Sequence, residues 1–206
     1  MKKLSIICVC LIALGFIACS GGSNSEKKVV IMASGKITVT DKTIQLDPSL
    51  THNEQEVIFK DDKLTLTVKS TAGTNKTFDL TDNGTYLVNL QTDTLIGGFV
   101  NYGSTGMPGS ISAEQMDHII DSTQQLMQGT NTNDTKGPFY VLPFNIKKIS
   151  AKGNTKVVGS FKGIPYKNDV DSDGNLPDVI KFFSVKQKRE TLKDLLEQRA
   201  KIKQNH

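Results

Sequence analysis

Alternation of apolar and polar residues with a period of two dominates the chain from Val29 to about Val100. Segments such as KITVT, KLTLTVKS and KTFDL are typical of half-buried β-strands. Turn-forming residues separate them at Asp41, at Asp61-Asp62 and at Asp82-Asn83-Gly84, where Asn-Gly is a strong hairpin signal. Evenly spaced short strands with tight turns predict an antiparallel sandwich or a barrel-like meander.

Two helices are predicted in the second half of the chain. Ser112 and Gln115 form a capping-box pattern, so a helix is expected from Ser112 to Gln128, ending before Gly129. Its predicted inward face consists of Met116, Ile119, Ile120, Thr123 and Met127. Ser184 and Gln187 repeat the capping pattern before a final helix to about Lys203. Its predicted inward residues are Val185, Leu192, Leu195, Leu196 and Ile202.

Further strands are expected in FYVLPFNIKKIS, TKVVGSFKGIPY and DVIKFF, and the glycine pair in TLIGGFV suggests a bend or a bulge. The sequence therefore predicts an α+β fold, mostly antiparallel β, with one mid-chain helix and one C-terminal helix. We expect a single β-rich domain over 29–206. Two lobes, 29–102 and 112–206, are the alternative, because the breaker-rich stretch GSTGMPGS lies between them.

The N-terminal residues have the organisation of a secretory signal peptide. A basic start, Met1-Lys2-Lys3, precedes 15 uncharged residues from Leu4 to Ala18. This run is shorter than the roughly 20 residues of a membrane-spanning helix. We therefore expect a signal peptide over 1–18, followed by a flexible polar tether over 19–28.

The residues Phe16-Ile17-Ala18-Cys19 resemble the lipobox of bacterial lipoproteins. The resemblance implies that Cys19 carries a diacylglycerol on its sulfur and becomes the first residue of the mature chain. It also implies a lipid-anchored protein of the cell envelope of a double-membrane bacterium. Ser20, rather than Asp, after the cysteine is the pattern of the lipoproteins that are sent on to the outer membrane, which this chain resembles here. The sequence leaves open whether the domain faces the periplasm or the outside.

Cys8 and Cys10 lie within the predicted signal peptide, so the mature chain keeps only Cys19 and cannot form an internal disulfide. The whole chain has a net charge of +4, of which Lys2 and Lys3 supply two, so no nucleic-acid partner is expected. The last helix is basic. The basic side chains of this helix are either solvated or in contact with anionic lipid or an acidic partner.

Alternate acidic residues in DVDSDGNLPD suggest a calcium loop. Asp169, Asp171 and Asp173 precede Gly174, and Asn175 offers a backbone carbonyl, as in the first half of an EF-hand loop, which the stretch resembles. The twelfth position is Ile180 rather than Glu, so Asp178 would have to replace that ligand. The competing interpretation is a solvated acidic turn, for which Asp and Gly are equally suited.

No catalytic pattern is visible in the sequence. There is no Gly-x-Ser-x-Gly elbow and no phosphate-binding loop, and His52, near Glu54 and Glu56, has no second histidine close by. We therefore expect a binding domain, for a protein, glycan or lipid ligand, that needs no cofactor unless calcium binds. The alternative is an envelope hydrolase with a carboxylate site that the sequence does not reveal.

Overall fold

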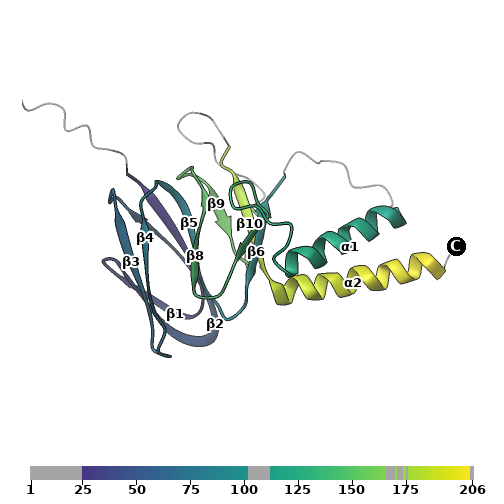
Figure 1. The fold of residues 1–206 in the computed structure, drawn as a ribbon, viewed down its shortest axis with the longest axis horizontal. Coiled ribbons are helices and arrows are strands. Elements are labelled where there is room, and N and C mark those ends of the chain that lie inside the picture. Colours follow the sequence, from purple (N-terminus) through teal and green to yellow (C-terminus); the bar gives the residue numbers. More distant parts are fainter. Residues whose placement is uncertain (1–24, 102–111, 166–169, 171–173, 175, 205–206) are drawn as a thin grey trace, which may run out of the picture.

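The computed structural model describes residues 25–101, 112–165, 170, 174 and 176–204. These ranges contain ten strands in two sheets and two helices, which confirms the predicted α+β class (Figure 1). The first sheet has the order β4 (Asn75–Leu80), β3 (Leu64–Ser70), β2 (Thr43–Phe59), β1 (Lys27–Thr40), β5 (Gly84–Leu90), β8 (Asn145–Ser150). The second has the order β7 (Phe139–Val141), β6 (Leu95–Phe99), β10 (Val179–Ser184), β9 (Lys156–Val158). The helices are α1 (Ala113–Met127) and α2 (Val185–Gln204).

The two sheets do not divide the chain at residues 103–111. Strand β8, from the second half of the sequence, pairs with β5 in the first sheet. Strand β6, from the first half, pairs with β7 and β10 in the second sheet. Each sheet therefore contains strands from both ranges, 29–102 and 112–206. Most pairings are antiparallel, as predicted, but β1 with β5, β2 with β3 and β9 with β10 are parallel.

A bent hairpin, β1 and β2, organises the first sheet. Its register breaks between Ser34, which pairs with His52, and Gly35, which pairs with Pro48. Before the break β1 pairs with β5, and beyond it β2 pairs with β3. Gly35 has φ 139°, and a Cβ there would lie 2.2 Å from the Asp47 carbonyl oxygen, so only glycine fits.

The six strands of the first sheet curl into a nearly closed barrel. Across its open edges, Lys76 Nζ lies 3.1 Å from the carbonyl oxygen of Phe144, just before β8. The interior is filled by a cluster that includes Ile31, Leu66 and Val88. The second sheet packs on the outside of β1, β5 and β8 through a second cluster that includes Met32, Leu87 and Phe182. All seven positions of β5 are therefore buried.

The first strand begins earlier than expected. Lys27 and Lys28 were predicted to belong to the flexible tether, but both lie in β1. Lys27 is fully buried, and its ammonium donates to the carbonyls of Asp61 at 2.6 Å and Asp62 at 2.9 Å. Lys28 pairs with Glu56 at 3.0 Å. These partners satisfy the two charges, so a polar segment forms a strand. Residues 1–24, with the predicted signal peptide and most of the tether, lie outside the described residues.

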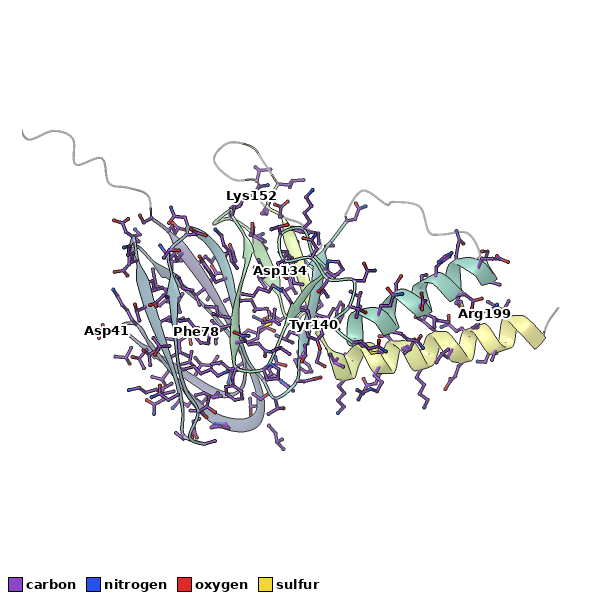
Figure 2. The ribbon with its side chains drawn as sticks, viewed as in Figure 1. Asp41, Phe78, Asp134, Tyr140, Lys152 and Arg199 are labelled. Carbon is purple, nitrogen blue, oxygen red and sulfur yellow. The ribbon has the colours of Figure 1, made fainter. Side chains whose placement is uncertain are left out.

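The two helices lie side by side and project from the strands (Figure 1). The predicted capping boxes are present in both: Ser112 with Gln115 and Ser184 with Gln187. Arg199 of α2 reaches α1 and donates from Nε and Nη2 to the Asp117 carboxylate, both at 2.7 Å (Figure 2).

The inward face of α1 is narrower than predicted. Met116 and Ile120 are buried against Leu192 of α2, with Met127 partly buried beside them. Ile119 was predicted to face inward, but it is 41% exposed, and Leu196 on α2 is 47% exposed. The reason is that each helix packs mainly against the other, so only a seam spaced by four and seven residues is covered.

Candidate functional site

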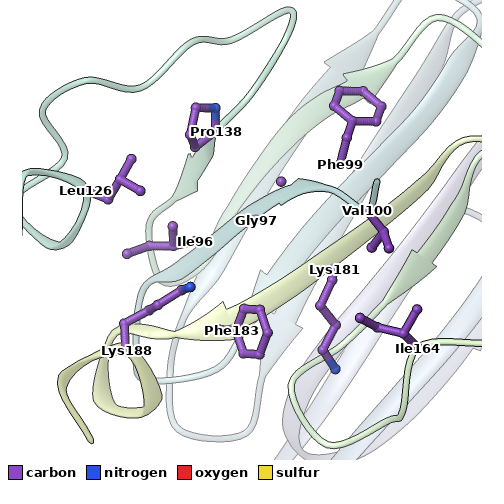
Figure 3. A pocket seen from close by; sticks show the side chains of 11 residues that line it. Ile96, Gly97, Phe99, Val100, Leu126, Pro138, Ile164, Lys181, Phe183 and Lys188 are labelled. Atoms are coloured by element: carbon purple, nitrogen blue, oxygen red, sulfur yellow. The ribbon is translucent and has the colours of Figure 1, made fainter. Parts of the chain in front are cut away.

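A cavity of about 330 Å³ lies on the face of the second sheet that points away from the barrel (Figure 3). Its floor is made by β6 and β10, where Gly98 pairs with Lys181 and Ile96 pairs with Phe183. Phe182, which lies between Lys181 and Phe183 on β10, points to the opposite face of the sheet and into the core between the sheets. The walls come from the last turn of α1, the first turns of α2 and two loops. The lining residues are Ile96, Gly97, Gly98, Phe99, Val100, Leu126, Pro138, Ile164, Lys181, Phe183 and Lys188.

The two adjacent glycines of β6 have different roles. A Cβ at Gly97 would lie 2.4 Å from the ring of Phe182, so packing of the core requires glycine there. A Cβ at Gly98 would meet no atom within 4 Å. The sequence predicted a bend or a bulge here, and pairing with β10 runs through both positions without a register shift, so there is no bulge. Gly98 therefore leaves the floor of the cavity open.

Lys181 is held by the neighbouring loop. Its ammonium donates to the carbonyl oxygens of Gly159 and Lys162, and the residue is only 8% exposed. Burial lowers the pKa of Lys181, and the nearby charge of Glu54 partly opposes that shift. Glu54 itself pairs with the Lys162 side chain at 3.0 Å. The hydrogen-bonding needs of Lys181 are thus largely met within the fold.

Lys188 has a different environment. It lies at the start of α2, half-buried, with Nζ 4.5 Å from the centroid of the Phe183 ring. Burial lowers the pKa of the Lys188 ammonium. No carboxylate in the described part of the chain forms an ion pair with it, and none lines the cavity. The side chain points into the space between Leu126, Ile96 and Phe183 (Figure 3).

A second cavity, of about 310 Å³, has a more polar lining and contains His52, Asp93 and Ser184. This combination has the residue types of a nucleophilic site, but each side chain has another role. The Ser184 hydroxyl accepts from the N–H of Gln187 and caps α2. The Asp93 carboxylate accepts from the N–H groups of Thr94 and Lys186. The ring of His52 stacks on Phe161, with centroids 3.8 Å apart.

The sequence neighbours of His52 are also engaged. Glu54 pairs with Lys162 and Glu56 with Lys28, so neither carboxylate is available to form a cluster with the histidine. In the described ranges no three His, Cys, Asp or Glu side chains come together as metal ligands would.

Half of the predicted calcium loop, 169–178, lies outside the described residues. Of its five ligand candidates, Asp169, Asp171, Asp173 and Asn175 fall there, as does the predicted lipidation residue Cys19. Asp178 is described, and its Oδ2 pairs with Lys152 Nζ at 2.9 Å. The calcium site therefore stays a prediction.

The sequence analysis did not identify the cavity residues. Its available signals were Lys181, a lone cation in the apolar strand DVIKFF, and the glycine pair of β6. Among the residues that the structure describes, no helix combines the length and apolar character that a membrane crossing requires. No family model, no curated protein and no solved structure matches this chain.

Proposed function

We propose that this protein is a lipid-anchored protein of the bacterial cell envelope whose β-rich body binds an apolar ligand in the cavity against β6 and β10. The anchor rests on the lipobox resemblance of Phe16-Ile17-Ala18-Cys19. Within the lipoprotein class, Ser20 rather than Asp after the cysteine supports the outer membrane as the location. Several acyl chains on one residue hold a protein firmly, where a single chain is marginal.

The observation that carries ligand binding is the open, apolar floor of this cavity. Ligand pockets are mostly apolar and have volumes of about 300–1,000 Å³, and 330 Å³ falls at the lower end of that range. Phe99 and Ile164 at its rim are each 46% exposed. Large apolar side chains that remain exposed around a hollow are typical of an interaction site.

A binding role accounts for the described side chains better than catalysis does. The polar groups of the second cavity cap α2 or stack, and none of the described residues that line the first cavity is a carboxylate. The alternative of an envelope hydrolase therefore has no comparable support.

Ligand binding is tested with a neutral apolar dye, N-phenyl-1-naphthylamine, whose fluorescence rises in an apolar site. The Gly98→Leu variant fills the cavity floor without backbone clash, so we expect it to weaken dye binding at least tenfold. Leu50→Ser, which removes a fully exposed leucine of β2, is the control and should bind like the wild type. Equal binding by wild type and Gly98→Leu would exclude this cavity as the site.

The anchor is tested separately with Cys19→Ala. We expect this variant to leave the membrane fraction, to incorporate no radioactive palmitate and to remain folded. Retention of the variant in the membrane pellet after a high-salt wash would contradict the anchor.

A further inference from the structure

Resting on the proposed function, we infer that the cavity selects a single-chain amphiphile with an anionic headgroup, and that Lys188 is the residue that sets this selectivity. The apolar walls of the cavity alone would accept a neutral ligand equally well. The charges around the cavity favour an anion.

Lys188 has no counter-charge among the residues that the structure describes. Removing an ion from water costs several kcal/mol unless a partner compensates. Within the described residues, the partner of Lys188 is the face of Phe183, at 4.5 Å. Such a contact stabilises a desolvated cation less than a close anion would. A ligand anion beside Nζ would supply the missing compensation.

The position of Lys188 on α2 also favours an anion. The N-terminus of a helix carries a partial positive charge, so cations there are unfavourable and anions favourable. The first turn of α2 contains no acidic residue of its own, and the anion at this end is the Asp93 carboxylate, which accepts from the Lys186 N–H at 2.8 Å. Asp93 does not line the cavity of Lys188, so on that side Lys188 adds its charge to the positive end of the helix. Lys181, with Nζ 5.2 Å from the same Phe183 ring, adds a second cation beside the cavity.

The volume of the cavity fits a single acyl chain. About 330 Å³ accommodates part of one acyl chain between Ile96, Leu126 and Ile164 rather than the two chains of a phospholipid. Because no carboxylate of the described residues lines the cavity, the headgroup of a cationic amphiphile would be repelled by Lys188 and Lys181. A carboxylate and a phosphate headgroup share the required chemistry, so a fatty acid and a single-chain phospholipid are the two sources to be distinguished.

The test is displacement of the bound dye by four ligands of equal chain length: dodecanoate, dodecyl phosphate, dodecanol and dodecylammonium, each below its micelle concentration. We expect the wild type to bind the two anions at least tenfold more tightly than dodecanol, because a hydrogen bond to a charged group contributes about 1.5–3 kcal/mol. Dodecylammonium should bind more weakly than dodecanol. Of the anions, tighter binding of dodecanoate assigns a fatty acid, and tighter binding of dodecyl phosphate assigns a single-chain phospholipid.

Lys188→Met should remove the preference for anions and leave the affinity for dodecanol unchanged, and Lys188→Arg should restore the preference. The matched control is Lys186→Met, an exposed lysine two residues earlier on α2, which should behave like the wild type. If Lys188→Met does not fold, the shift of the Lys188 side-chain resonance on adding dodecanoate to the wild type provides the same test.

Equal affinity of the wild type for dodecanoate and dodecanol would overturn the inference. The proposed function would still stand if Gly98→Leu blocked both ligands. Loss of anion preference in Lys186→Met but not in Lys188→Met would also overturn it.

Discussion

Replacing Lys27 with methionine tests how the first strand is fixed to the barrel. Methionine keeps a long apolar stem at this fully buried position but removes the donor to Asp61 and Asp62. Each hydrogen bond from a charged donor contributes about 1.5–3 kcal/mol, so the two together contribute about 3–6 kcal/mol. The substitution also removes a buried charge, whose desolvation costs several kcal/mol. Since these effects oppose each other, we expect a net loss of about 1–3 kcal/mol.

The assay is thermal and urea unfolding of the Cys19→Ala protein followed by circular dichroism. At about 2–4 °C per kcal/mol for a domain of this size, Tm should fall by about 2–12 °C. Lys36→Met is the matched control, because Lys36 is an exposed lysine of the same strand and its loss should change stability by less than about 0.5 kcal/mol. A Lys27→Met protein that melts at or above the temperature of the Lys36→Met protein would refute the reasoning, since desolvation would then outweigh both hydrogen bonds.

Gly35→Ala should cost more than about 2 kcal/mol, measured by urea unfolding, because both its φ and its close approach to β2 exclude a Cβ; a cost below 0.5 kcal/mol would contradict the bent hairpin. Ile120→Asp should cost about 3 kcal/mol or more and Ile119→Asp much less, since only Ile120 is buried; the reverse order would contradict the observed helix seam. Lys188→Met should raise Tm at pH 7. The lowered pKa of Lys188 means that its charged form destabilises the fold, so this gain should shrink as the pH rises toward the ordinary lysine value of 10.5; a gain that stays constant with pH would argue against a desolvated ammonium. If 169–178 binds calcium at a Kd of about 0.5 mM, 2 mM calcium should add about 1 kcal/mol of stability, visible as a rise in Tm; equal melting in 5 mM calcium and in chelator would leave only an acidic turn.

The sequence predicted best where the signal was local. Ser112 with Gln115 and Ser184 with Gln187 placed both helix starts, because a capping box is complete within four residues. Period-two alternation likewise predicted the strands around the turn at Asp41. In both cases the determining contacts lie between residues close in sequence.

Features that depend on distant partners were missed. Lys27 was predicted to belong to the tether, because the carbonyl groups of Asp61 and Asp62 that bind its ammonium are more than thirty residues away in the sequence. Gly97 and Gly98 were predicted to form a bend or a bulge. The need for glycine at Gly97 comes instead from the ring of Phe182, which is distant in sequence. Lys188 was predicted only as one charge of a basic helix, because its half-buried position depends on Ile96 and Leu126, which are distant in sequence and line the same cavity.

The early start of β1 limits how far an anchored protein could move. Ser25 is already buried, and its hydroxyl donates to the Asp62 carboxylate, so only six peptide units separate it from Cys19. Fully extended, six residues span at most about 22 Å, whereas a compact domain with a radius of gyration of about 16 Å is about 40 Å across. The tether from Cys19 to Ser25 is shorter than the domain is wide, so a protein acylated at Cys19 would remain next to the bilayer. The end of the domain at Asp61 and Asp62, where Ser25 is bound, would face the lipid. A ligand leaving that bilayer would then meet the protein at a high effective concentration, and even modest intrinsic affinity would suffice to keep the site occupied.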